Sequence, residues 1–79
     1  MDMPGEEDAV AETMASTLAA IGNRVRKART NRGMTLQEIA QVSGLSPSML
    51  SLVERGRASP SIGSLIVIAN ALGVPMSEL

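Results

Sequence analysis

Helix stop and start signals divide most of this 79-residue chain into short segments. A serine, threonine or proline follows within five residues of Gly33, Gly44, Gly56 and Gly73. Glycine favours the position just after a helix, hydroxyl side chains cap helix starts, and proline suits a first helical turn. No segment alternates β-branched with polar residues over the length of a strand. The sequence therefore predicts one small all-α domain.

These signals predict a compact bundle of five helices with an N-terminal helical extension. The helices are expected at 9–31, 36–42, 46–55, 62–72 and from Pro75 to Leu79. In the first, apolar residues recur from Val10 to Val25 at steps of four, four, three and four, which is typical of one helix face. Gly22 interrupts this pattern and is the place where the helix could break or kink. Residues 1–16 are expected to form an acidic, partly helical leader, and residues 17–79 the folded domain.

The apolar positions of these helices predict the core. We expect it to contain Leu18, Ile21, Val25, Ala28, Met34, Leu65, Ile68, Leu72 and Val74. Ile66 and Val67 flank this set on the fourth expected helix, so that either one, if exposed, would mark a contact with another subunit or domain. Val10 and Met14 lie on the leader side, and we expect this stretch to pack as a helix on a neighbour, in a dimer.

The charges are segregated along the chain. Residues 1–22 hold five acidic residues and no basic one, for a charge of −5, whereas residues 23–79 carry +4. The net charge of −1 therefore hides a basic domain behind an acidic leader. A basic domain of this size favours a polyanion such as nucleic acid as its partner.

Several functions are disfavoured by the residue types that the chain lacks. It has no cysteine, histidine or aromatic residue, so we expect no metal, no cofactor and no enzyme activity. Single-strand and RNA-reading proteins stack bases on aromatic rings, whereas duplex binding needs none. The longest apolar run, Leu65–Ala69, is too short to cross a membrane. Zero cysteine fits the reducing cytoplasm.

The segment around Gly44 predicts two short helices that cross at a tight turn. A turn of this kind needs one residue that tolerates positive φ, which Gly44 supplies, and a small residue at the contact, which Ala40 supplies. Apolar residues at inward spacings complete the unit: Leu36, Ile39, Leu45, Leu50 and Val53. The alternative is an ordinary helical hairpin in a small bundle.

The residues from Ile21 to Leu79 resemble the lambda-repressor-like, Cro/C1-type helix-turn-helix family of DNA-binding domains. The matching stretches are Arg24–Arg29, Gly33–Ala40, Ser43–Ser51, Val53–Gly56, Ser59–Ser61 and Leu65–Pro75. The resemblance implies a transcriptional regulator that binds double-stranded DNA with its third helix in the major groove, as a homodimer on a two-fold operator. It also implies a bacterial cytoplasmic protein associated with the nucleoid. The most similar subgroup carries a C-terminal sensor domain, of cupin type, in a longer parent protein.

The resemblance assigns roles to individual residues. Base readout falls on the start of the third helix, at Ser46, Pro47, Ser48, Ser51 and Leu52. For Ser46, helix capping is the favoured alternative. Leu52 replaces the polar residue usual in the family and suits a thymine methyl or a protein surface instead. Arg29 and Glu54 are expected to form a structural salt bridge between the first and third helices.

Phosphate contacts are expected from the basic and N-terminal groups near the reading helix. The candidates are Thr35, Gln37, Arg55, Arg57, Arg24, Arg26 and Lys27. For Arg24, Arg26 and Lys27 a solvated basic face is an equally good interpretation. Leu52, the acidic leader and the weak hydrogen-bonding selectivity of serine also leave a second function open, a protein-interaction module that keeps this fold.

Overall fold

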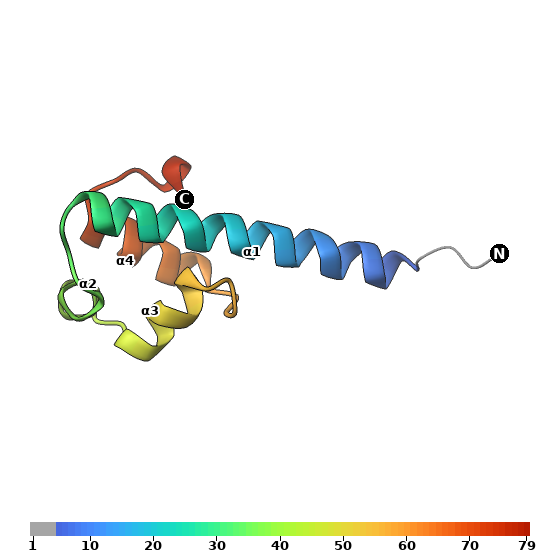
Figure 1. The fold of residues 1–79 in the computed structure, drawn as a ribbon, viewed down its shortest axis with the longest axis horizontal. Coiled ribbons are helices and arrows are strands. Elements are labelled where there is room, and N and C mark those ends of the chain that lie inside the picture. The colour runs from blue at the N-terminus through green and yellow to red at the C-terminus, as the bar shows by residue number, and fades with distance from the viewer. Residues whose placement is uncertain (1–4) are drawn as a thin grey trace.

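The computed structural model describes residues 5–79, except for the side chain of Glu6. In this part of the chain it contains four α-helices and one short 3-10 helix, and it contains no strand (Figure 1). The elements are α1 (Glu6–Asn31), α2 (Leu36–Ser43), α3 (Pro47–Glu54), α4 (Ile62–Leu72) and η1 (Met76–Glu78). The all-α prediction is confirmed.

The prediction of a fifth helix is wrong, because the segment after Pro75 forms only a single 3-10 turn. The Glu78 N–H donates to the Pro75 carbonyl at 3.0 Å, and the Leu79 N–H donates to the Met76 carbonyl at 3.0 Å. Both bonds span three residues rather than four. Five residues offer at most one α-helical hydrogen bond, which does not offset the cost of nucleating a helix.

Helix α1 is longer than predicted and continuous through Gly22. It begins at Glu6 rather than at residue 9, and the Gly5 carbonyl accepts the N–H groups of Asp8 and Ala9 at 3.1 and 3.2 Å. Acidic residues in a first turn favour this start, because the N-terminal end of a helix carries partial positive charge. Residues 7–17 are exposed and project beyond the bundle (Figure 1). We call residues 6–17 the arm.

The core lies where the four helices meet. Six side chains from all four helices are fully buried: Val25, Ile39, Leu50, Val53, Ile68 and Leu72. Ile21, Ala28, Met34 and Val74 pack around them, half-buried. The predicted core is confirmed at these positions, while Leu18 and Leu65 are half-buried at its edge. Ile66 is exposed, whereas Val67 is half-buried.

Gly22 lies where α1 crosses the end of α3. A Cβ atom at Gly22 would lie 2.7 Å from the carbonyl oxygen of Glu54 and closer still to that of Val53. Real Cβ atoms do not approach backbone that closely, so only glycine permits this crossing. The predicted break or kink does not occur, because the residue serves helix packing instead.

None of the helices in residues 5–79 combines the length and the hydropathy that crossing a bilayer requires.

We expect Gly22→Ala to destabilise the domain. Alanine favours a helix interior by about 1 kcal/mol over glycine, but overpacking against rigid backbone costs up to about 3 kcal/mol. The expected net loss is about 2 kcal/mol in the free energy of unfolding, measured by urea denaturation.

Gly63→Ala in α4 is the matched control. A Cβ there would meet only the Ser61 hydroxyl, at an ordinary 3.8 Å. This variant should be neutral or more stable by up to about 1 kcal/mol. Equal behaviour of the two variants would contradict the close crossing at Gly22.

Candidate nucleic-acid interface

Local capping interactions fix both helices of the helix-turn-helix unit. The Thr35 hydroxyl accepts the Glu38 N–H at 3.1 Å, and the Glu38 carboxylate accepts the Thr35 N–H at 3.0 Å. This reciprocal capping box starts α2. Gly44 ends the helix with φ of 76°, a left-handed conformation, and its N–H donates to the Ala40 carbonyl at 2.9 Å. The prediction that Gly44 adopts a positive φ in the turn between the two helices is confirmed.

Ser46 is the N-cap of α3. Its hydroxyl oxygen accepts the Met49 N–H at 3.1 Å, and Pro47 occupies the first helical position. This geometry satisfies a backbone donor that the helix itself cannot pair. The favoured interpretation of Ser46 as a cap is therefore confirmed, and its predicted part in base readout stays a prediction.

The outward face of α3 brings the other predicted readout residues together. Pro47, Ser48, Ser51, Leu52 and Arg55 line one shallow groove. Ser48 is exposed, Ser51 is half-buried, and Leu52 has 38% of its surface exposed. Hydroxyl, apolar and cationic groups thus lie side by side on the exposed side of α3.

A second shallow groove continues this surface onto α2. It is lined by Thr35, Gln37, Glu38, Ala40, Gln41 and Pro47. Because Pro47 lines both grooves, they form one surface, which we call the reading face. Gln41 was not among the predicted site residues, although its spacing of four residues from Gln37 places both on one side of a helix. That spacing is the signal that could have identified it.

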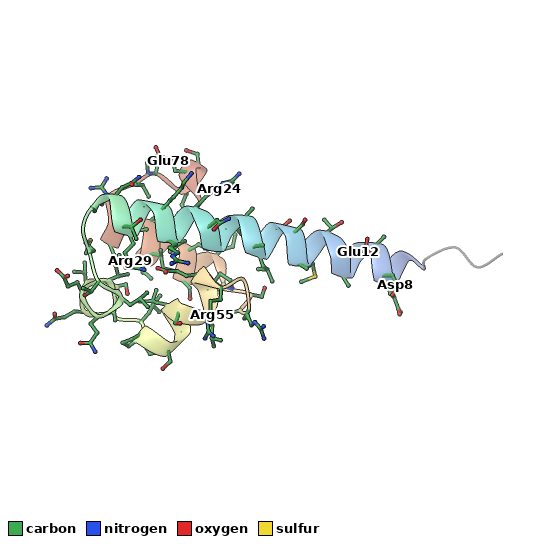
Figure 2. All side chains as sticks on the ribbon, in the orientation of Figure 1. Asp8, Glu12, Arg24, Arg29, Arg55 and Glu78 are labelled. Carbon is green, nitrogen blue, oxygen red and sulfur yellow. The ribbon has the colours of Figure 1, made fainter. Side chains whose placement is uncertain are left out.

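The predicted phosphate-binding residues fall into two groups. Arg55 lies on the reading face, where its Nε donates to the Ser51 carbonyl at 3.3 Å, and Arg57 is exposed in the loop that follows α3. Arg24 lies beside Glu78, on the side of α1 away from Arg55 (Figure 2). There it donates to the Leu79 carbonyl at 3.3 Å.

The other two predicted phosphate-binding residues of α1 lie near Arg24. Arg26 and Lys27 line a groove with it on the outer side of α1, and Lys27 also lines a neighbouring groove with Glu78. The structure therefore does not place Arg24 and Lys27 on the reading face.

One ion pair joins α1 to the end of α3. The Arg29 guanidinium donates to both Glu54 carboxylate oxygens, at 2.7 and 2.9 Å, and to the Met34 carbonyl at 2.8 Å. The two side chains are only 16% and 7% exposed. The hydrogen bond to Glu54 raises the pKa of Arg29 above its usual value, so the guanidinium stays charged. The predicted salt bridge is confirmed, and it fixes α3 relative to α1.

Comparison with known proteins identifies this arrangement. Residues 25–79 match the helix-turn-helix family HTH_3. The chain is 39% identical over 59 residues to an uncharacterized HTH-type transcriptional regulator, y4dJ, of Sinorhizobium fredii, which covers 75% of this chain and 77% of that protein. It spans only 41% and 32% of two longer regulators that it also matches. A sensor domain after Leu79 gains no support from these matches.

Solved structures show the same fold. The restriction-modification controller protein C.AhdI of Aeromonas hydrophila superposes with a TM-score of 0.78 and 33% identity, over 80% of this chain and 96% of that chain. A hypothetical transcription factor, NHTF, from Neisseria superposes over 99% of this chain and 80% of its own, with a TM-score of 0.75 and 28% identity. The second match extends over the arm.

We expect Arg29→Ala and Glu54→Ala each to lower the free energy of unfolding by up to about 3 kcal/mol, because each leaves a largely buried charge without its partner. The double variant should lose little more than either single one. Urea denaturation of the three variants gives the coupling energy.

Arg32→Ala is the control for this cycle. Arg32 is exposed and donates a single hydrogen bond, to the Gly73 carbonyl at 3.1 Å. Its loss should cost no more than about 0.5 kcal/mol. Additive losses for Arg29 and Glu54 would contradict the structural role of the pair.

Proposed function

We propose, from the premise that this chain belongs to the helix-turn-helix family HTH_3, that α3 reads double-stranded DNA from the major groove. At the coarser level the function is plain: the chain is a DNA-binding transcriptional regulator of this family and not an enzyme. The finer proposal concerns which residues touch bases, which touch phosphates, and how two copies share an operator.

The groove on the outward face of α3 is the observation that supports base readout. The Ser48 and Ser51 hydroxyls can donate to or accept from base edges, and Leu52 and Pro47 offer apolar contact to a thymine methyl. Serine can hydrogen-bond to several bases, so its selectivity among them is modest. Some of its contacts to bases would be bridged by water. Ser46 contributes by capping the helix that presents the others.

Candidate phosphate-binding groups lie near both ends of α3. The α2 N-terminus presents Thr35 and Gln37 beside the groove, where backbone N–H groups and side chains suit a phosphate. Arg55 and Arg57 supply positive charge at the other end of α3. Arg24, Arg26 and Lys27 lie round α1, so DNA would have to curve toward them for their predicted contacts to form.

We infer a homodimer on a two-fold operator. An eight-residue reading helix spans only a few base pairs, so one copy carries little sequence information. Two copies related by a two-fold axis would read half-sites about one helical turn, roughly 34 Å, apart. A DNA target of this kind would place the protein in the cytoplasm, with the bacterial nucleoid.

Two observations favour a second function. Leu52 is exposed on the reading face, and the arm is acidic, which suits contact with a protein better than contact with DNA. A protein-interaction module with this fold would bind duplex DNA weakly and without sequence preference. A titration of the protein with duplex DNA separates the two functions.

The first test is fluorescence anisotropy of labelled duplexes between about 50 and 200 mM salt, with random DNA and the upstream region of the protein's own gene. We expect binding to random DNA to weaken as salt rises, because each neutralised phosphate releases counterions. One palindromic site should bind more tightly. Flat, weak binding to every duplex would favour the protein-interaction module.

Variants assign the contacts. The double variant Ser48→Ala/Ser51→Ala should lose about 1 to 2 kcal/mol on the specific site and nothing on random DNA. Arg55→Ala should weaken both and lower the salt slope by about 1. Lys27→Ala removes the same charge from the other side of α1 and should change the slope less. If Arg55→Ala and Lys27→Ala lowered the salt slope equally, phosphates would contact both the reading face and the outer side of α1.

A further inference from the structure

The arm has an apolar stripe that nothing in the described residues, 5–79, covers. Val10 and Met14 are 56% and 51% exposed. Most helical stability in proteins comes from packing one apolar face against other parts of the structure. The arm therefore lacks the contact that usually holds such a helix.

The exposed stripe continues into a groove. Met14, Thr17 and Ile21 form its wall on α1, and Pro60 and Leu65 form the opposite wall. The groove is mostly apolar and open to solvent. Thus the bare face of the arm and a complementary apolar groove lie along a single helix.

The residues of this face recur at steps that suit helix pairing. They are Glu7, Val10, Met14, Thr17, Ile21 and Arg24, at steps of three, four, three, four and three. Alternating steps of three and four make the seam of a coiled coil. We call these six residues the seam.

We propose that the occupant of this groove is the arm of a second copy of this chain, paired antiparallel with the first along the seam. In that register Val10 lies opposite Ile21 of the other copy, and Met14 lies opposite its Thr17. Glu7 then lies opposite Arg24 of the other copy, which places opposite charges at both ends. The seam is thus complementary to itself, as a two-fold interface requires.

The seam also leaves the α3 groove accessible to DNA, although it takes Arg24 out of the candidate phosphate contacts. Helix α3 crosses α1 at Gly22, which lies on a different side of the helix from Val10, Ile21 and Arg24 at 100° per residue. None of the residues lining the α3 groove belongs to the seam. The inference rests on the dimeric form of the proposed function, but self-association is measured without DNA, so the two can fail separately.

The test is sedimentation of the full chain over a range of concentrations. The wild-type chain should form a dimer, and Met14→Asp should raise the dissociation constant at least about tenfold by placing charge in the seam. Met14 is exposed, so the variant should keep its fold, as circular dichroism would show. A wild-type chain that stays monomeric, or a dimer indifferent to Met14→Asp, would overturn the proposal.

A charge exchange fixes the register. Glu7→Lys and Arg24→Glu should each weaken the dimer several-fold, and the two together in one chain should restore it. Glu12→Lys makes the same charge change on the opposite side of the arm and should leave the dimer as it is. If Glu12→Lys weakens the dimer as much as Glu7→Lys, or the exchange fails to restore it, this seam is wrong. If a monomeric chain still bound DNA, the seam would be refuted while the proposed role of α3 in reading DNA would hold.

Discussion

The contact between α1 and the end of α3 determines where the reading helix lies. At Gly22 the two backbones touch, with no side chain between them. Two turns further along the same side of α1, Arg29 holds Glu54 through two hydrogen bonds. One contact sets the separation of the helices and the other sets their rotation. Leu50 and Val53, the core side chains of α3, are fully buried in the same structure.

Arg29 extends this constraint to the loop before α2. Its third hydrogen bond, to the Met34 carbonyl, ties the segment that leads into the capping box at Thr35. The guanidinium therefore connects α1, the end of α3 and the loop before α2. The relative positions of these three segments define the reading face. A planar group with five donors suits this task better than a lysine ammonium would.

Residues whose role depends on nearby backbone were predictable from the sequence. Thr35, Gly44 and Ser46 act within four residues of themselves, so the ends of α2 and α3 could be predicted to within one or two residues. The role of Gly22 was not predictable, because the carbonyls that exclude a side chain there belong to residues more than thirty positions away. The division of the arginines into two surfaces was missed for the same reason. The sequence of α1 does not show which of its sides faces α3, because that depends on how the two helices pack. The helix predicted after Pro75 failed because a start signal alone does not supply enough hydrogen bonds.

The opposite charges of the two halves are separated in space as well as in sequence. Asp8 and Glu12 lie on the arm, away from Arg55 (Figure 2). Glu12 precedes the crossing at Gly22 by ten residues, or about 15 Å of helix, which exceeds the screening length of about 8 Å at physiological salt. A phosphate at the reading face would therefore experience the basic domain with little opposition from the acidic arm.

Because α1 is unbroken from the arm to the bundle, it fixes an angular phase between them. Each residue of a helix adds about 1.5 Å and 100°. Inserting one residue between Met14 and Gly22 would leave both ends locally intact, yet it would rotate the apolar stripe by about 100° around the helix axis relative to α3. An insertion of seven would return the phase to within about 20° and only lengthen the arm. The helix between the arm and the bundle can therefore change in length only in increments close to whole turns if the stripe is to keep its orientation relative to α3.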